Sequence, residues 1–322
     1  MGTNTFTENL KAFFRAIKQD NELQGKYMRA PTKADAQRIT ALHERKHGVP
    51  GMLCSIDCLH VFWKNCPVAW QGQFRNGKNK HSSIVVEAGV DYNTWVWSAS
   101  IGHAGTQSDI NIWDQSPLHR MFLSDEMVEN IDFSFHVDGE HFDMLWCLVD
   151  GIYPATARFV KTISYPIGHA ARMFVEWQEA CRKDSERTFG IVVRKFQILA
   201  RPMEYWDLED VKNITYGCFV MHNMMVERRV EREETEEAGM YDVLSSAEDD
   251  QEEARGDDLD QFVRFAHRFT PQARDMAYQI QLAKERFTKL NNDARHVRLQ
   301  RAIMNHVAAN YIEEKKRRSP SL

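Results

Sequence analysis

The sequence predicts a mixed α/β domain with helices at both ends of the chain. Apolar runs of strand length, separated by turn residues, give the order strand, two further strands, helix and strand, and helical periodicity follows. This order is typical of a mixed sheet covered by helices. The predicted elements follow in chain order: helical segments over 5–47, strands at 52–63, 82–90 and 95–101, a helix at 107–122, strands or an extended loop at 131–143, a buried strand at 145–149, and helices at 170–199, 208–227 and 261–314.

Turn and cap residues divide these segments. Pro31 interrupts the first helical stretch, and Thr32 is a suitable N-cap for the helix that follows. Residues 91–93 form the turn between two strands. The glycines of residues 102–105 are expected to end the second of these strands before the next helix begins.

Composition indicates a protein with a sizeable core, without a membrane span or a disulfide framework. The chain has 322 residues, 43% of them hydrophobic, which is enough for a sizeable core. It contains no run of 18 or more apolar residues, so no membrane span is expected. The six cysteines are scattered, which indicates a reducing compartment rather than a disulfide framework. Cys54, Cys58, His60 and Cys66 lie close together, but their spacing matches no standard zinc pattern, and ordinary half-buried thiols are favoured.

Charge is distributed unevenly along the chain. Residues 231–260 carry 14 acidic and two basic side chains, a net charge of −12. Because the whole chain has a net charge of −5, the remainder has +7. A basic body is compatible with a nucleic-acid partner. The acidic strip has few apolar residues and is predicted to be a flexible linker.

Three carboxylates are candidates for metal binding. Asp57 lies inside an apolar strand, Asp150 closes another, and Glu186 lies in the middle of a helix. Two strand aspartates and one helix glutamate can converge on divalent cations, which prefer carboxylate oxygen. On the residues alone, a strand-end cap or turn for the aspartates and a solvated helix position for Glu186 are more common outcomes.

Several sequence blocks carry a family resemblance, and they occur in family order over about residues 27–230. The blocks are PGMLCSIDCLH from Pro50, WKNCP and WQGQ from Trp63 and Trp70, GTQSDIN from Gly105, DGIYP from Asp150, FVKTI from Phe159, EACRKDSERTFG from Glu179 and MHNM from Met221. Together they resemble the plant-type PIF/Harbinger transposases. The 35 residues between Asp150 and Glu186 are a spacing typical of DDE recombinases.

The resemblance implies an RNase H-like mixed sheet flanked by helices and a metal-dependent DNA endonuclease or transposase. The family's catalytic, metal-binding carboxylates fall on Asp57, Asp150 and Glu186, with two Mg²⁺ ions as cofactors and Mn²⁺ as a substitute. Ser185 stands where family members usually carry Val, and it is expected to face away from the metals. The implied partner is DNA, with a separate Myb-like (SANT) DNA-binding protein and a homo-oligomer as further possibilities and no membrane.

These expectations divide the chain into four segments and give the protein a location in the cell. They are an N-terminal helical segment without a clear helix-turn-helix (1–50), the nuclease domain (51–230), the acidic flexible linker (231–260) and a C-terminal helical segment with a basic tail (261–322). The short N-terminal segment indicates a truncated copy, a partial gene model or a domesticated form. The tail 315–318, KKRR, indicates nuclear import, with a cytoplasmic stage until import with a partner.

Other side chains are weighed against ordinary structural roles. Asp109 begins a predicted helix and is favoured as a cap, with a place near the site as the alternative. Candidates for contact with DNA are Arg182, Lys183 and Arg187 and, at lower odds, Lys161 and Tyr153. The tryptophans 63, 70 and 95 are favoured as core residues over base-stacking platforms.

Two rival functions remain open beside the nuclease. One is a domesticated, transposase-derived interaction protein that keeps the fold without the catalytic activity. The other is an unrelated enzyme with two catalytic carboxylates, such as a glycosidase, for which independence of metal would be the signature. Retention of all three acids and the ordered blocks favour the nuclease.

Overall fold

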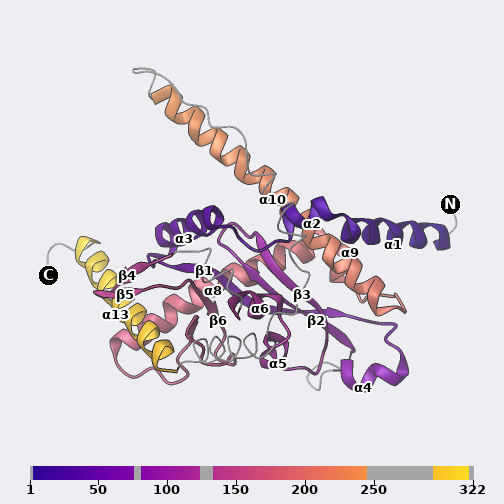
Figure 1. The fold of residues 1–322 in the computed structure, drawn as a ribbon, viewed down its shortest axis with the longest axis horizontal. Helices are drawn as coiled ribbons and strands as arrows, with labels where there is room; N and C mark the ends of the chain where they lie inside the picture. The colour runs from indigo at the N-terminus through magenta and orange to yellow at the C-terminus, as the bar shows by residue number, and fades with distance from the viewer. Residues whose placement is uncertain (1–2, 76–80, 124–132, 245–292, 319–322) are drawn as a thin grey trace, which may run out of the picture.

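The fold is built around one mixed β-sheet with helices on both faces (Figure 1). The computed structural model describes residues 3–75, 81–123, 133–244 and 293–318. The strands of this sheet are β1 (Met52–Phe62), β2 (Ser83–Val90), β3 (Val96–Ala104), β6 (Trp146–Val149) and β7 (Phe159–Lys161). Their order is β3-β2-β1-β6-β7.

Strand directions divide the sheet into two halves. β1, β2 and β3 are antiparallel neighbours, whereas β6 and β7 run parallel to β1. This is an RNase H-like arrangement, so the predicted fold class is confirmed. A separate hairpin is formed by β4 (Phe135–Val137) and β5 (Glu140–Phe142).

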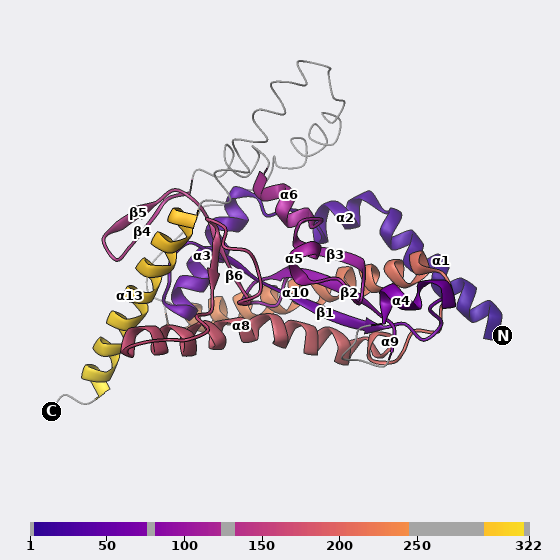
Figure 2. The ribbon, with the colours of Figure 1, turned by 90° about the horizontal axis from the view of Figure 1, so that it is seen from below.

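The helices bury apolar side chains on the two faces of the sheet. Figure 2 shows α8 (His169–Lys195) on one side, and α5 (Asp109–Trp113) and α6 (Pro117–Leu123) on the other. Phe189 of α8 packs in one cluster with Val61 of β1, and Trp113 of α5 packs in another with Ile56. Because side chains alternate along a strand, Asp57 shares the face of Val61, toward α8.

The terminal helices pack onto this unit. The N-terminal helices are α1 (Thr3–Gln19), α2 (Asn21–Tyr27) and α3 (Lys33–His47), the connections contain η1 (Val68–Trp70), α4 (Gln71–Phe74) and α9 (Gln197–Ala200), and α10 (Leu208–Leu244) and α13 (Asp293–Arg318) follow. α1 packs against α10, and α13 against α8 and β7. None of the helices in the described ranges has the length and apolar character that a membrane crossing requires.

Local signals explain several helix ends. Thr32 caps α3 as predicted, and Asp35 returns a hydrogen bond to the Thr32 backbone, completing a capping box. The helix ends at Gly48, whose φ of +75° is a left-handed conformation that glycine adopts without a Cβ penalty. The first helical stretch has a second break, at Asp20, which caps α2.

Some predicted boundaries are wrong. The helix expected at 107–122 is two short helices, because Pro117 begins a new one. β3 continues to Ala104 through Gly102, whose φ of +103° absorbs an irregularity instead of ending the strand. β7 was not predicted.

The C-terminal half also differs from the prediction. α10 continues to Leu244 instead of ending near 227, so residues 231–244 of the predicted flexible linker are helical. Residues 245–260 of that linker and residues 261–292 of the predicted helical segment lie outside the described residues. α13 agrees with the predicted helix for the part that is described, and the side chains of the basic tail lie outside it.

Candidate carboxylate site

Asp57 and Asp150 lie at corresponding positions of two neighbouring parallel strands. Ser55 of β1 pairs with Leu148 of β6, and two residues further on each strand stand Asp57 and Asp150. Asp150 directly follows β6, at a carboxyl strand end, which is a common ligand position in such sheets, and Asp57 lies beside it inside β1. The Asp57 side chain is 21% exposed and that of Asp150 is 45% exposed. The pair therefore lies at the border between core and solvent.

Arg182 of α8 joins the two aspartates. Its guanidinium nitrogens lie 3.6 Å from Asp57 Oδ2 and 3.5 Å from Asp150 Oδ1. These distances exceed the 2.7–2.9 Å or so of a close charge-assisted hydrogen bond, so the contact is mainly electrostatic. The buried Nε atom of Arg182 has no hydrogen-bond partner among the described residues. Arg182 is thus a loosely held cation between two carboxylates.

Burial and neighbouring charge act on the Asp57 carboxyl. Burial raises its pKa, and the negative charges of Asp150 and Asp109 raise it further. The backbone N–H of Cys58, which donates to Asp57 Oδ1 at 2.9 Å, and the charge of Arg182 oppose this shift. A carboxylate that is partly desolvated and close to another is stabilised by additional positive charge. This electrostatic environment suits the binding of cations.

Glu186 lies on α8 one turn beyond Arg182 and is exposed. Residues four apart occupy one face of a helix, so Glu186 belongs to the same side of α8 as the arginine. Among the described residues, Glu186 makes no hydrogen bond or ion pair with either aspartate. The structure therefore joins the two aspartates through Arg182, and the role of Glu186 as third ligand stays a prediction.

Ser185 does not face away from the site, so the prediction for this residue is wrong. It is fully buried, and its hydroxyl lies 3.4 Å from Asp57 Oδ2. The hydroxyl also donates to the backbone carbonyl of Arg182 at 2.7 Å. The error came from assigning the inward face of α8 to Glu186, whereas the helix is rotated so that Asp184 and Ser185 are buried.

Two further acids surround this region: Asp109, whose charge acts on Asp57, and Glu87, whose charge neighbour is Asp109. Asp109 is half-buried in the first turn of α5, which Ser108 caps, and its charge raises the pKa of Asp57. Glu87 of β2 pairs with Cys58 of β1 and is 2% exposed. Burial raises the pKa of Glu87 to about 7, Asp109 contributes in the same direction, and hydrogen bonds with Ser116 and Tyr153 oppose the shift. Glu87 was not among the predicted site residues, although an acid inside the apolar run of β2 was a signal for it.

The other residues that were predicted to contact DNA differ in burial and in their bonding partners. Lys161 ends β7 beside the aspartates, with its pKa lowered by burial while the charge of Asp150 raises it. Lys183 is exposed on α8. Arg187 donates to the Tyr92 carbonyl and pairs with Asp184 at 3.1 Å. Tyr153 is 1% exposed, so the prediction that it touches DNA is wrong.

The tryptophan and cysteine predictions have mixed outcomes. Trp63 is buried as predicted, whereas Trp70 is 43% exposed and is not a core residue. The thiol of Cys54 lies 3.1 Å from that of Cys147, and the Cys66 thiol donates to the Pro67 carbonyl. The clustered cysteines of the sequence thus have separate surroundings, in agreement with ordinary thiols.

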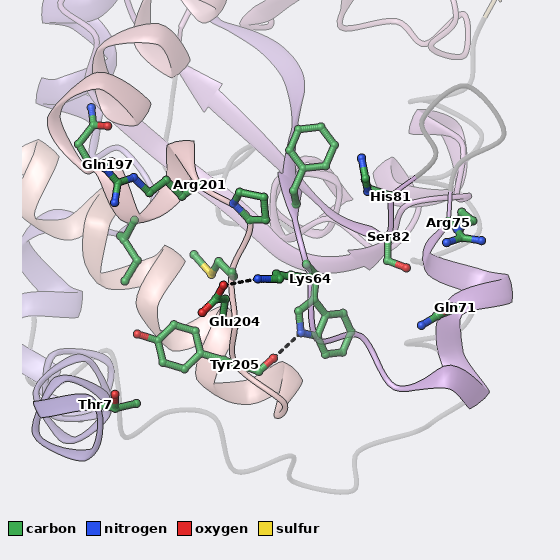
Figure 3. Close-up of a pocket in the computed structure, with 15 residues that line it drawn as sticks. Thr7, Lys64, Gln71, Arg75, His81, Ser82, Gln197, Arg201, Glu204 and Tyr205 are labelled. Atoms are coloured by element: carbon green, nitrogen blue, oxygen red, sulfur yellow. Dashed lines mark hydrogen bonds and ion pairs between the residues drawn. The ribbon is translucent and has the colours of Figure 1, made fainter. Parts of the chain in front are cut away.

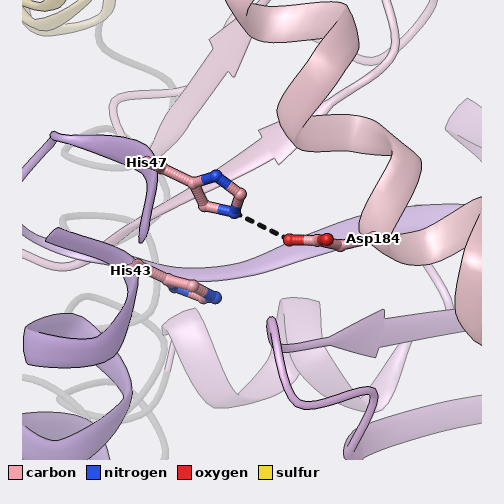
Figure 4. Close-up of side chains that lie close together, drawn as sticks. All are labelled: His43, His47 and Asp184. Carbon is pink, nitrogen blue, oxygen red and sulfur yellow. Dashed lines mark hydrogen bonds and ion pairs between the residues drawn. The ribbon is translucent and has the colours of Figure 1, made fainter. Parts of the chain in front are cut away.

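A second group of possible metal ligands consists of His43, His47 and Asp184 (Figure 4). His43 is fully buried, and its Nδ1 lies 2.8 Å from the Met52 carbonyl while its Nε2 accepts the Tyr92 N–H at 2.9 Å. Both ring nitrogens are therefore used, and burial lowers the pKa of His43 to about 4. His47 Nε2 lies 2.7 Å from Asp184 Oδ2. These bonds tie α3 to β1 and α8 and leave no free ligand atom on His43.

Fold and site together define an RNase H-like α/β protein whose sheet presents paired carboxylates beside a helix. A family model described as plant transposon protein matches residues 25–234, more than half of the chain. The chain belongs to this family of transposon proteins. The match covers all five strands of the main sheet and both aspartates. No curated protein and no solved structure matches the chain.

Proposed function

We propose that this protein is a metal-dependent DNA endonuclease or transposase of the PIF/Harbinger type, acting through a DDE triad of Asp57, Asp150 and Glu186. The observation that carries the proposal is the pair of aspartates, one inside β1 and one directly after the neighbouring strand β6, with the Arg182 guanidinium between them. Membership of the transposon family supports it, and it favours this function over a glycosidase.

The residues present fit divalent cations. The Arg182 guanidinium already places a positive charge between oxygens of Asp57 and Asp150. Carboxylate oxygens are the ligands that Mg²⁺ and Mn²⁺ prefer. Two such cations, when bound, supply a nucleophile of lowered pKa and stabilise the leaving oxygen of the phosphodiester. Asp57 and Asp150 would hold them, with Glu186 completing the set from α8.

Residues of the chain orient the carboxylates and supply positive charge at the site. The Cys58 N–H holds one oxygen of Asp57, which leaves the other directed toward Arg182. Asp150 is more exposed and is accessible to a substrate from solvent. Lys161, beside Asp150 on the next strand, supplies positive charge for a DNA phosphate. Strand position orients the carboxylates, and the cationic side chains attract the DNA backbone.

The remaining functional expectations belong to the same proposal. We propose two Mg²⁺ ions as cofactors, DNA as substrate, a separate Myb-like (SANT) protein for target recognition, a homo-oligomer and a nuclear location. Residues 51–230 would form the nuclease domain. The basic remainder outside the acidic strip 231–260 supports a nucleic-acid partner through charge.

A second candidate is a domesticated interaction protein without catalysis. It is favoured by one observation: Arg182 pairs with both aspartates, and Glu186 lies outside the hydrogen bonds and ion pairs described for the site. Such salt bridges would serve to hold α8 against the sheet and need no catalytic role.

Calorimetric titration of Mn²⁺ into the full chain separates the two candidates. The test variant is Asp57→Asn with Asp150→Asn, and Asp143→Asn, an exposed aspartate before β6, is the matched control. Circular dichroism checks that all variants are folded. Binding by the wild type and the control but not by the double variant supports the nuclease. A folded wild type that binds no Mn²⁺ at millimolar concentration, with DNA present, supports the interaction protein.

A further inference from the structure

A pocket of about 920 Å³ opens at the end of β1, away from the aspartates (Figure 3). We name it the β1-end pocket. Its charged and polar lining side chains include Thr7, Lys64, Gln71, Arg75, His81, Ser82, Gln197, Arg201, Glu204 and Tyr205. Figure 3 shows Arg201 and Gln197 on one side, Arg75 and His81 on the other, and Lys64 between them. The pocket thus presents positive charge from both sides.

The cations of the β1-end pocket are available to a ligand. Arg75 and Arg201 are exposed, and neither side chain has a hydrogen bond or ion pair with another described residue. Lys64 pairs with Glu204 at 2.5 Å, but the two side chains are 59% and 67% exposed. An exposed pair of this kind contributes little to stability, so Lys64 can exchange Glu204 for another anion. Glu204 is the only acid that lines the described pocket.

The pocket is connected to the aspartates along β1. Phe62, which lines the pocket, lies five positions after Asp57 on β1, so the distance is about 16 Å at roughly 3.3 Å per residue. Residues 57–60 are half-buried, whereas 52–56 are buried. Beside them, β6 has ended at Val149, and the next backbone partner of β1 is Met203, which donates to the Phe62 carbonyl at 2.8 Å. One partly open strand edge leads from the site to the pocket.

We propose that the β1-end pocket binds the phosphodiester backbone of the DNA that flanks the cleaved bond. This inference rests on the proposed function. A B-DNA strand advances about 3.4 Å per nucleotide, so 16 Å or so places the contact roughly five nucleotides from the bond at the aspartates. Cations spread over two walls suit a row of phosphates, and the amides and hydroxyl of Gln71, Gln197 and Ser82 are typical phosphate donors.

Salt-dependent DNA binding tests the inference without cleavage. Fluorescence anisotropy would measure binding of the full chain to a duplex in EDTA over a series of salt concentrations. The test variant is Arg75→Gln with Arg201→Gln. The control is Arg120→Gln with Arg172→Gln, which removes the same charge from exposed positions on α6 and α8 that do not line the pocket.

The pocket variant is expected to bind at least tenfold more weakly at low salt, and its salt slope to fall by about 1.8, for two phosphate contacts at about 0.9 each. The control is expected to keep a slope closer to that of the wild type. Equal slopes for both variants would overturn the inference. So would an absence of DNA binding by the wild type, or tighter binding of polyglutamate than of DNA, which indicates an acidic protein partner.

The same assay separates this inference from the proposed function. Asp57→Asn with Asp150→Asn is expected to bind DNA in EDTA with the wild-type slope, because it leaves the pocket unchanged. If Mn²⁺ binding fails while the pocket variant still loses its phosphate contacts, the nuclease is rejected and the DNA contact stands. If Mn²⁺ binds and the slopes are equal, the pocket is rejected alone.

Discussion

The guanidinium of Arg182 lies 3.6 Å from the Asp57 carboxylate, where its positive charge offsets the negative charges of two neighbouring aspartates. Asp150 shares the same guanidinium at 3.5 Å. The contact links α8 to β1 and to the residue that follows β6. Any cation that binds both aspartates must either displace Arg182 or share the carboxylates with it.

Arg182→Gln is therefore expected to lower the free energy of unfolding in EDTA by about 1–3 kcal/mol, because two neighbouring carboxylates lose their common cation. Mn²⁺ is expected to restore more stability to this variant than to the wild type, since no guanidinium competes. Thermal unfolding with EDTA or Mn²⁺ measures both effects. Lys183→Gln, at an exposed neighbouring position, is the control. If Arg182→Gln and the wild type gain equally from Mn²⁺, the competition is absent.

Glu186→Gln is expected to behave differently. Glu186 is exposed and makes no described hydrogen bond or ion pair, so its replacement should change the free energy of unfolding in EDTA by at most about 0.5 kcal/mol. Its loss should nevertheless weaken Mn²⁺ binding and abolish metal-dependent DNA cleavage. Calorimetry and a nicking assay check this, with the exposed Glu179→Gln on the same helix as control. Unchanged Mn²⁺ affinity in Glu186→Gln would remove this residue from the triad.

The raised pKa of the buried Glu87 carboxyl leads us to expect that the free energy of unfolding depends on pH. Burial raises its pKa from 4.5 to about 7, so the folded state holds the proton more tightly than the unfolded state. The wild type should lose stability relative to Glu87→Gln as the pH rises from 4.5 to about 7. The loss is on the order of 3 kcal/mol and should level off above that window. Urea unfolding of both proteins across this range measures it, and parallel stability curves would contradict the prediction.

The His47–Asp184 contact is expected to be structural. Asp184 is 6% exposed and also pairs with Arg187, so Asp184→Asn should lower the free energy of unfolding by about 2 kcal/mol. Because both nitrogens of His43 are occupied, Zn²⁺ should not raise the melting temperature through this group. Urea unfolding and zinc melts test the two statements. A zinc stabilisation that Asp184→Asn removes would show instead that the group binds metal.

Much of the fold could be predicted because its signals are local. The apolar run of β1, the cap at Thr32 and the short buried strand before Asp150 depend on neighbours in the sequence. Errors occurred where local patterns compete. Glycine ends many strands, yet Gly102 is accommodated within β3, and the periodicity of residues 107–122 continues across the break before Pro117.

The sequence by itself determined the two aspartates in and after apolar strands, the helical character of residues 169–195 and the family resemblance, because apolar periodicity and residue order are properties of the chain alone. Only the tertiary structure decided which face of α8 meets the sheet. That rotation is set by packing of Phe174, Cys181, Phe189 and Val192 against distant elements. It directs Arg182 and Ser185 toward Asp57, and it buries Asp184 against His47. Packing between residues that are far apart in the sequence, which local sequence patterns do not reveal, therefore arranges the charges around the aspartates.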